Sequence, residues 1–405
     1  MNRKLIILTE IIAPYRIPVF NSLAKIEGID LHVIFLAETD PFVREWLVYK
    51  EEIDFSYEVL ASYRRRWRNR NMLLNRGMNA ALRKASPDII LCGGYNYLAS
   101  WQALLWAGRN RVPFLLWAES NAKDLRRKSW FVESLKSRFL SKCDAFVVPG
   151  KASLEYLESF GISAKKIFTA PNAVDNDFFS QMSIKVRNNS AKLRQDFGLP
   201  TRFFLFVGRM VAEKGVFDLL HAYRKLDPDL RCEFGLIFVG DGAARSELSK
   251  LAHDVTPGCV RFPGFVQREN LTTYYALAEA LVFPTHAEVW GLVVNEAMAS
   301  GLPVICTEVT GCAADLVEEG WNGRVVPPRD VGRCDDPAVL AQTSACCRPS
   351  RWPAGNRWFE SRAPTPTAPP RRARPTGLAT HGRVRIARPA RASSHRAGRA
   401  ARRRG

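Results

Sequence analysis

PTHAEVWGLVVNEAMASGLPVI, residues 284–305, has the pattern of a loop, a helix, a glycine stop and a buried strand. Gly291 opens the predicted helix, Gly301 suits the left-handed conformation that ends one, and Pro303 prevents its continuation. The apolar run at 280–283 predicts another short strand just before the loop. Free backbone N–H groups and the helix dipole both attract negative charge, so a strand, a turn and a helix start predict an anion site. The expected apolar face of the helix comprises Leu292, Val293, Ala297 and Met298.

Two carboxylates bracket this predicted anion site, Glu288 in the loop and Glu296 on the helix. A helix rises ~1.5 Å per residue, which places Glu296 roughly 7 Å beyond the helix start, about the step from a pyrophosphate to a ribose. Carboxylates accept hydrogen bonds from vicinal hydroxyls. The layout therefore suits a nucleotide sugar, with the phosphates between two hydroxyl-binding acids. The alternative is that Glu288 is a loop charge and Glu296 part of a solvated helix face.

The pair Glu288 and Glu296, the dipeptide at 290–291 and the ending ASGLPVI at 299–305 resemble the retaining glycosyltransferases of family 4. The resemblance covers about residues 140–330, and more loosely 1–140. It implies an α/β protein with the GT-B fold, in which two Rossmann-like, doubly wound parallel-sheet domains face each other across a cleft. It also implies transfer of a hexose-type sugar from a nucleotide diphosphate with retention at the anomeric carbon, the leaving phosphate taking the proton of the acceptor hydroxyl.

The loop GRMVAEKG at 208–215 resembles the phosphate-binding loop of that family. Gly208 allows a tight turn, and Arg209 and Lys214 place two cations beside it. A pyrophosphate leaving group gains charge as the sugar–phosphate bond breaks, so fixed cations lower the barrier. Arg209, Lys214 and Glu288 are the predicted catalytic residues. Alternatively, the two cations pair with surface acids such as Glu213.

No metal or other cofactor is expected, because no D-x-D pair follows a strand and the two cations can neutralise the phosphates. GDG at 240–242 and GFV at 264–266 together resemble the part of the family site that holds the base. The predicted donor-binding residues are Gly208, Arg209, Lys214, Gly240, Gly242, Phe265, Val266, Glu288, Gly291, Leu292, Val293 and Glu296.

The candidate acceptor-binding residues are Tyr15, Arg16, Tyr95 and Glu119. The first loop, APYR at 13–16, lacks the glycine pair of many family members, and WAES at 117–120 lacks their histidine. These side chains are therefore acceptor contacts or ordinary loop residues. His286 lies next to the predicted sugar site, but the sequence shows no partner for it.

Strand and helix patterns alternate along the first 330 residues, which predicts parallel sheets. Lys4–Thr9 is a predicted strand, a helix follows from about Ile17, and Leu31–Leu36 is the next strand. Later examples are a helix at Trp130–Leu140 and a strand at Ala145–Val148. The expected organisation is an acceptor-binding domain at 1–180, a polar linker at 181–191, a nucleotide-sugar domain at 192–330 that is incomplete, and a basic tail at 331–405.

The 405-residue chain has a net charge of +19, which is concentrated in the tail. Residues 331–405 contain 17 Arg, no Lys, nine Pro and one Ile, and lack apolar periodicity, so we expect disorder. Our hypothesis is a frameshift or assembly error that costs stability and activity. The alternative is a genuine basic arm that binds a polyanion.

Nine scattered cysteines without a CxxC pair indicate reduced thiols in a cytoplasmic protein. The apolar run at the start is too short for a signal peptide, and no run approaches the ~18 residues of a spanning helix. Two basic and aromatic stretches, 62–76 and 123–142, are either solvated helix faces or contacts to anionic lipid on the inner face of the plasma membrane. The proposed lipid contacts are Arg64, Arg65, Arg66, Lys123, Arg126 and Arg127, with Trp67, Trp130 and Phe131 at the interface.

The predicted function is sugar transfer from a nucleotide sugar to a lipid-linked or saccharide acceptor in cell-surface polysaccharide synthesis. No nucleic acid partner is expected. The alternatives are a nucleotide-sugar epimerase of the GT-B fold and a non-catalytic GT-B protein whose tail binds a polyanion.

Overall fold

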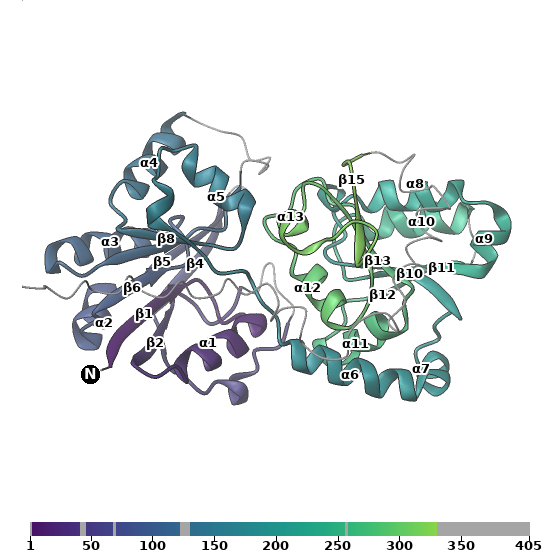
Figure 1. The fold of residues 1–405 in the computed structure, drawn as a ribbon, viewed down its shortest axis with the longest axis horizontal. Coiled ribbons are helices and arrows are strands. Elements are labelled where there is room, and N and C mark those ends of the chain that lie inside the picture. The colour runs from purple at the N-terminus through teal and green to yellow at the C-terminus, as the bar shows by residue number, and fades with distance from the viewer. Residues whose placement is uncertain (1, 41–45, 68–69, 122–129, 256–257, 330–405) are drawn as a thin grey trace, which may run out of the picture. The chain divides into compact units, whose positions relative to one another are not determined.

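The first sheet has seven parallel strands in the order β3-β2-β1-β6-β7-β8-β9 (Figure 1). The computed structural model describes residues 2–40, 46–67, 70–121, 130–255 and 258–329. The strands are β1 (Arg3–Thr9), β2 (Ile29–Phe35), β3 (Ser56–Val59), β6 (Ile89–Cys92), β7 (Phe114–Trp117), β8 (Ala145–Val148) and β9 (Ile167–Thr169). The helices are α1 (Ile17–Ala24), α2 (Met78–Ala85), α3 (Leu98–Asn110), α4 (Trp130–Leu140) and α5 (Lys151–Glu158), with short 3₁₀ turns at Pro14–Arg16, Lys50–Glu52 and Ala164–Lys166.

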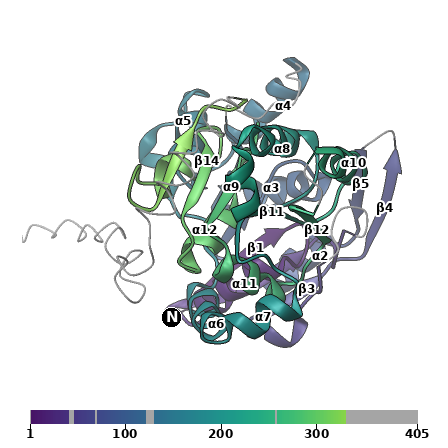
Figure 2. The same ribbon diagram turned by 90° about the vertical axis from the view of Figure 1, so that its right-hand side faces the viewer.

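The second sheet has six parallel strands in the order β12-β11-β10-β13-β14-β15. They are β10 (Arg202–Val207), β11 (Phe234–Val239), β12 (Val260–Gly264), β13 (Ala280–Phe283), β14 (Val304–Thr307) and β15 (Gly323–Val326). Helices α8 and α10 lie side by side over one face of this sheet, and α11, α12 and α6 lie together on the other (Figures 1 and 2). The helices are α6 (Asn176–Asn188), α7 (Ser190–Asp196), α8 (Val216–Lys225), α9 (Pro228–Glu233), α10 (Arg245–Val255), α11 (Arg268–Leu277), α12 (Leu292–Ala299) and α13 (Ala313–Leu316), with a 3₁₀ turn at Ala212–Lys214.

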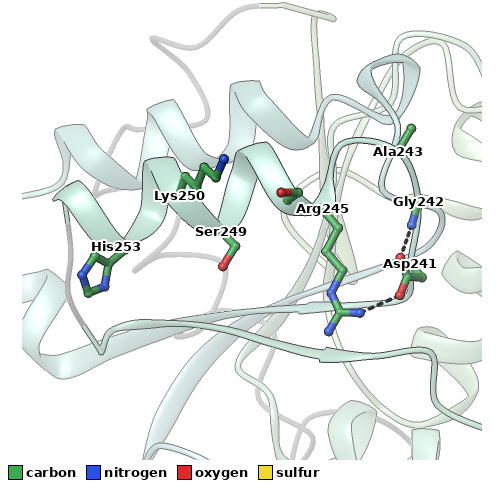
Figure 3. Close-up of a pocket in the computed structure, with 8 residues that line it drawn as sticks. Asp241, Gly242, Ala243, Arg245, Ser249, Lys250 and His253 are labelled. Atoms are coloured by element: carbon green, nitrogen blue, oxygen red, sulfur yellow. Dashed lines mark hydrogen bonds and ion pairs between the residues drawn. The ribbon is translucent and has the colours of Figure 1, made fainter.

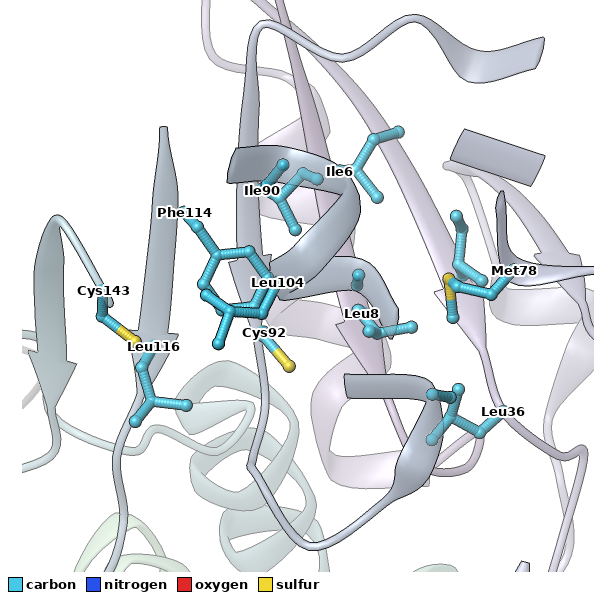
Figure 4. Close-up of a cluster of buried hydrophobic side chains, with 14 of the residues drawn as sticks. Ile6, Leu8, Leu36, Met78, Ile90, Cys92, Leu104, Phe114, Leu116 and Cys143 are labelled. Carbon is cyan, nitrogen blue, oxygen red and sulfur yellow. The ribbon is translucent and has the colours of Figure 1, made fainter. Parts of the chain in front are cut away.

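Successive side chains of the central strands pack on opposite faces of the first sheet. Ile6 and Leu8 of β1 join the cluster that contains α2 and α3, and Figure 4 shows them near Leu104 of α3. Ile7, between them, joins a second cluster with Phe20 of α1. Successive side chains of a strand point to opposite faces, so β1 must be apolar at consecutive positions to be covered on both. This is why the run LIIL at 5–8 specifies a buried parallel strand.

The basic stretch at 62–76 forms an antiparallel hairpin of β4 (Ser62–Trp67) and β5 (Arg70–Asn75), and its reading as helix faces is wrong (Figure 2). Arg64 points inward, where its Nη1 lies 2.6 Å from Asp40 Oδ2 and 3.7 Å from Glu10 Oε1. The outward face carries Tyr63, 63% exposed, opposite Leu74 in the register. Arg64 is therefore committed to internal ion pairs and is not a surface charge.

Both sheets reverse their strand order once, and these reversals position the candidate site. In the first sheet the reversal lies between β1 and β6, and in the second between β10 and β13. In open parallel sheets ligands bind beyond the carboxyl ends of the strands at such a reversal. The loops that follow β10 and β13 contain Arg209, Lys214 and Glu288. The topology thus brings together the residues that the sequence analysis had singled out.

Several predicted features can be compared with the structure directly. The strand at 280–283 and the helix at 130–140 have the expected bounds, and Gly301 has φ +72° at the end of α12. The segment predicted as the polar linker, 181–191, is mostly helical because α6 continues to Asn188, with Asp175 accepting from Phe178 N at its start. The tail at 331–405, together with Lys123, Arg126 and Arg127, lies outside the described residues.

Candidate functional site

Glycines let the loops after β10 and β11 approach each other closely. A Cβ on Gly240 would lie 2.0 Å from the carbonyl oxygen of Gly208, and one on Gly242 would lie 2.4 Å from that of Met210. Their φ angles of +130° and +156° also disfavour other residues. Met210 N donates to Asp241 O at 2.8 Å, which joins the two turns. Gly208, Gly240 and Gly242 therefore shape the backbone at the edge of the sheet.

Lys214 and Glu288 form an ion pair, with 2.5 Å between Nζ and Oε2. Their side chains are 13% and 20% exposed, so the pair is mostly buried but still reaches solvent. The other carboxylate oxygen of Glu288 accepts from Val289 N at 3.0 Å. The suggested alternative, in which Lys214 pairs with Glu213, is therefore wrong. A cation and a carboxylate from two loops at the strand-order reversal are held together.

Arg209 and Phe265 reach solvent at the same edge of the sheet. Arg209 is exposed, and within the described part of the chain it forms no ion pair. Phe265 is 42% exposed and Val266 half-buried. An exposed ring beside a glycine turn can stack on a planar ligand, and an unpaired guanidinium can bind an anion. The structure thus leaves both side chains accessible where the sequence analysis placed donor contacts.

Helix α12 begins at Gly291, whose φ of +96° makes it the left-handed N-cap. Its buried face differs from the prediction, because Val294 and Asn295 are buried while Leu292 and Val293 are half-exposed. The Asn295 amide accounts for this difference. It accepts from Trp290 Nε1 at 2.9 Å and donates to Asn172 O at 3.0 Å, which satisfies a buried polar group. The first turn of the helix, with Leu292 and Val293, is thereby left open to a ligand.

Glu296 is half-buried on the same helix and accepts a hydrogen bond of 2.6 Å from the Tyr275 hydroxyl. Surrounding protein atoms desolvate the carboxyl group and raise its pKa to about 7, and the Tyr275 bond only partly opposes this. Tyr275 is fully buried, and its ring meets Phe179 of α6 edge-on at 6.1 Å. One carboxylate oxygen is fixed by the tyrosine, so the other can accept from a ligand hydroxyl.

The candidate acceptor residues lie on the loops of the first sheet. Arg16 and Glu119 are joined by a 2.8 Å ion pair, and the Arg16 guanidinium lies over the Trp117 ring at 4.5 Å. Burial opposes the charge of Arg16, but Glu119 outweighs it and the pKa is raised. Tyr95 instead meets the Ser120 hydroxyl at 3.3 Å. The ring of Tyr15 packs edge-on against Trp46 at 5.9 Å, an ordinary packing contact.

Asn121 follows Ser120 in the loop after β7, and it connects the acceptor candidates with the loop that carries Glu288. Asn121 Nδ2 donates to the carbonyl oxygens of Glu288, at 3.1 Å, and Val289, at 3.4 Å. Both sheets belong to one unit, Met1–Trp358, so this contact lies within it. No sequence pattern pointed to Asn121, because its partners are 167 and 168 residues away.

Two family models match the chain. The model described as Glycosyltransferase Family 4 matches residues 20–178, and the one described as Glycosyl transferases group 1 matches residues 189–336. Together they match about three quarters of the chain, and one falls on each sheet. The chain belongs to the group 1 glycosyltransferases.

Parts of the chain are similar to individual transferases. Sulfoquinovosyl transferase SQD2 of Arabidopsis thaliana is 32% identical over 213 residues, which are 51% of this chain and 40% of that protein. O-antigen chain mannosyltransferase B of Escherichia coli is 31% identical over 180 residues, 44% of this chain and 45% of that protein. The chain thus spans less than half the length of these two relatives.

A solved structure supports the fold. Anabaena Alr3699/HepE in complex with UDP and glucose superposes with a TM-score of 0.65 and 18% identity, covering 85% of this chain and 94% of that one. The GT-B fold expected for a group 1 glycosyltransferase is confirmed by this likeness and by the two parallel sheets.

A shallow pocket of about 900 Å³ lies on the second sheet of this glycosyltransferase, beside α10. Figure 3 shows Arg245 reaching back to Asp241, 2.6 Å away, with Lys250 and His253 further along the helix. The pocket is open, and Gly242 is its only lining residue among the predicted donor contacts. Because Lys214, Glu288 and Glu296 do not line it, we place the candidate site at the strand-order reversal.

Two features are absent from the described residues of the glycosyltransferase. Those residues contain no group of three His, Cys, Asp or Glu side chains placed to hold a metal ion. None of their helices is long and apolar enough to cross a membrane. Cys92, Cys143, Cys306 and Cys312 are free thiols, and all four are buried.

Glu296 predicts a pH-dependent stability for this glycosyltransferase. Its folded pKa of about 7 lies above the ordinary 4.5, so the folded protein retains a proton that the unfolded chain has lost between those pH values. The free energy of unfolding should therefore fall as pH rises through this window, by about 3 kcal/mol from this group. The Glu296→Gln variant has no titrating carboxyl group at this position, but its amide oxygen can still accept a hydrogen bond from the Tyr275 hydroxyl.

Melting temperatures of the parent and of Glu296→Gln, recorded at intervals from pH 4.5 to 8, test this expectation. The variant should gain stability relative to the parent with rising pH. A constant difference across the range would show that the carboxyl group titrates normally. The exposed Glu247 of α10, changed to Gln, is the matched control and should show no such trend.

Proposed function

We propose that this protein is a retaining glycosyltransferase that uses a nucleotide diphosphate sugar as donor. The observation that carries the proposal is the Lys214–Glu288 pair at the start of α12, with Glu296 further along the same helix. The open N-terminus of α12 supplies backbone N–H groups for a diphosphate. Glu296 then faces the ribose, and Glu288 faces the transferred sugar.

The proposed chemistry needs no side-chain nucleophile. Lys214 and Arg209 stabilise the charge that develops on the leaving diphosphate, which is the largest single contribution in many enzymes. Glu288 holds a sugar hydroxyl and orients Lys214. The acceptor hydroxyl attacks from the face that the diphosphate vacates and passes its proton to the leaving phosphate. Because the two cations supply the neutralising charge, we expect transfer to proceed without an added metal ion.

We further propose a lipid-linked or saccharide acceptor in cell-surface polysaccharide synthesis. The name of the Escherichia coli relative, an O-antigen chain mannosyltransferase, supports this class of acceptor. The Arg16–Glu119 pair lies on the first sheet, and Asn121, two residues beyond Glu119, contacts the Glu288 loop. An acceptor bound near Arg16 and Glu119 would thus lie beside residues that contact the sugar loop.

The test is a donor panel. UDP-glucose is the first probe, since the Anabaena structure contains UDP and glucose, followed by UDP-galactose, GDP-mannose and their N-acetylated relatives. Purified protein is incubated with each donor, and release of the nucleoside diphosphate is measured with and without saccharide acceptors. The proposal predicts release from at least one donor that is lost in Lys214→Ala. If a folded protein releases nucleoside diphosphate from none of the donors, the alternative of a non-catalytic GT-B protein is favoured. If the donor is converted to its epimer, the alternative of a nucleotide-sugar epimerase is favoured.

We also propose that the protein works at an anionic membrane surface on the cytoplasmic side. The support comes from the outer face of the β4–β5 hairpin, where Arg65 is exposed beside Tyr63, Met72 and Leu74, the last three 63%, 43% and 43% exposed. A basic surface with exposed apolar side chains suits an interface of anionic lipid. The side chains of Arg66, Trp67, Trp130 and Phe131 lie outside the described residues, and their part stays a prediction.

Phosphatidylglycerol vesicles provide the measurement for this membrane proposal. Neutralising Arg65 together with Arg66, Lys123, Arg126 and Arg127 should abolish salt-sensitive cosedimentation, since each such charge is worth ~1 kcal/mol at an anionic surface. Arg64→Gln should leave binding unchanged and lower the melting temperature, because it removes the ion pair with the buried Asp40. Undiminished binding by the quintuple variant would end the membrane proposal.

A further inference from the structure

The loop that carries Glu288 is fastened to the backbone on both sides of Lys214. His286 N donates to the carbonyl oxygen of Glu213 at 2.8 Å, and Thr285 Oγ1 donates to the same oxygen at 3.2 Å. On the other side, a Cβ on Gly215 would lie 2.0 Å from the carbonyl oxygen of Pro284, so the two backbones are in contact. The position of Lys214 is therefore set by residues 284–286.

A side-chain bond completes this attachment. His286 Nε2 lies 2.6 Å from Asp218 Oδ2, and the two side chains are 16% and 25% exposed. A carboxylate can only accept, so Nε2 carries the proton. Asp218 lies in the first turn of α8, which begins just after Lys214. The imidazole thus joins the Glu288 loop to the helix that directly follows the catalytic cation.

We propose that His286 is a positioning residue, which holds Lys214 and Glu288 in the geometry needed for transfer through its bond to Asp218. The imidazole is committed to Asp218 and need not touch the substrate. Misplacing a catalytic group by about 1 Å can cost ~10²-fold in rate. His286 has this role only if the proposed function holds, so the experiment separates the two.

The experiment is a double-mutant cycle on the transfer rate with the donor found in the panel. His286→Ala should lower kcat ~10- to 100-fold with a smaller change in KM for the donor, because positioning acts on the chemical step. If His286 acts through Lys214, the variant lacking both side chains should be no more than about threefold slower than Lys214→Ala alone. A multiplicative loss would show that His286 acts independently, and would overturn the proposal.

Two further variants separate positioning from folding. His286→Gln can donate an amide N–H to Asp218 and should recover much of the rate, whereas His286→Ala should not, at matched melting temperatures. His221→Ala, an exposed histidine of α8, should behave as the parent. Equal rates for the parent and His286→Ala would also overturn the proposal.

A binding measurement keeps the outcome separate from the proposed function. If the parent releases no diphosphate from any donor, the proposed function fails, and the same cycle is measured as affinity for UDP. Loss of Lys214 and loss of His286 should then lower UDP affinity in a non-additive way. Additive losses, or an unchanged affinity in His286→Ala, would contradict the positioning role.

Discussion

Lys214→Ala is expected to lower the rate of sugar transfer ~10²–10³-fold, the usual cost of removing one charge-stabilising group from a transition state. Lys214 still reaches solvent, although its ammonium is 2.5 Å from Glu288 and only 13% of its side chain is exposed. A diphosphate that arrives at the start of α12 can share this cation without a large rearrangement. Arg209→Ala should act in the same direction, because its exposed guanidinium, in the loop after β10, is the second proposed cation.

The matched control for the lysine is Lys192→Ala, an exposed lysine of α7, which should keep the parental rate. Initial rates at saturating donor separate an effect on the chemical step from an effect on binding. The comparison is valid only if Lys214→Ala and Arg209→Ala have the same melting temperature as the parent. Turnover within threefold of the parent in a folded Lys214→Ala would remove Lys214 from the mechanism.

Glu296→Ala should weaken binding of the free nucleoside diphosphate by ~1.5–3 kcal/mol, roughly ten- to a hundredfold. The carboxylate is held by Tyr275 with its second oxygen available to a ribose hydroxyl, so its removal also strands a buried tyrosine hydroxyl. Glu288→Ala should leave that affinity unchanged or make it tighter, because Lys214 loses its competing partner. The same change should abolish most transfer, since the sugar loses its hydroxyl contact.

Calorimetric titration of UDP into both variants and the parent measures this division of labour. Glu296→Gln is the intermediate case, since the amide keeps an acceptor for Tyr275 but loses the charge. Equal losses in Glu288→Ala and Glu296→Ala would refute the assignment of one acid to the ribose and the other to the sugar. Titration at pH 6 and pH 8 adds a check, because the pKa of Glu296 of about 7 makes its charge vary over that range.

The sequence predicted the strands and helices of the second sheet well, because the signals there are local. Short loops join the strand at 280–283 to the helix at 292–299, so glycine, proline and apolar runs specify each boundary. Glu288 lies in the loop before α12 and Glu296 on α12 itself, and their roles in donor binding stay predictions. The hairpin at 62–76 was missed because its outward and inward positions are both rich in arginine, which hides the two-residue period.

Contacts between distant residues could not be read from one sequence. Asp218 lies 68 residues before His286, which is why the sequence alone showed no partner for this histidine. Tyr275 lies 21 residues before Glu296, on a different helix, and only the packing of α11 beside the second sheet brings its hydroxyl to the carboxylate. In the sequence, Asn295 is a polar residue within an apolar stretch. Its burial is explained only by its hydrogen bonds to Trp290 and Asn172, which the structure shows.

The most direct test of a retaining, nucleotide-sugar-dependent transfer is the anomeric configuration of the first product. Proton NMR of a reaction with an α-linked donor from the panel, recorded before mutarotation or further turnover, reports that configuration together with released nucleoside diphosphate. We predict an α-linked product, formed in step with one diphosphate per transfer and absent from Lys214→Ala. A β-linked product, or transfer without release of diphosphate, would contradict the mechanism at its centre.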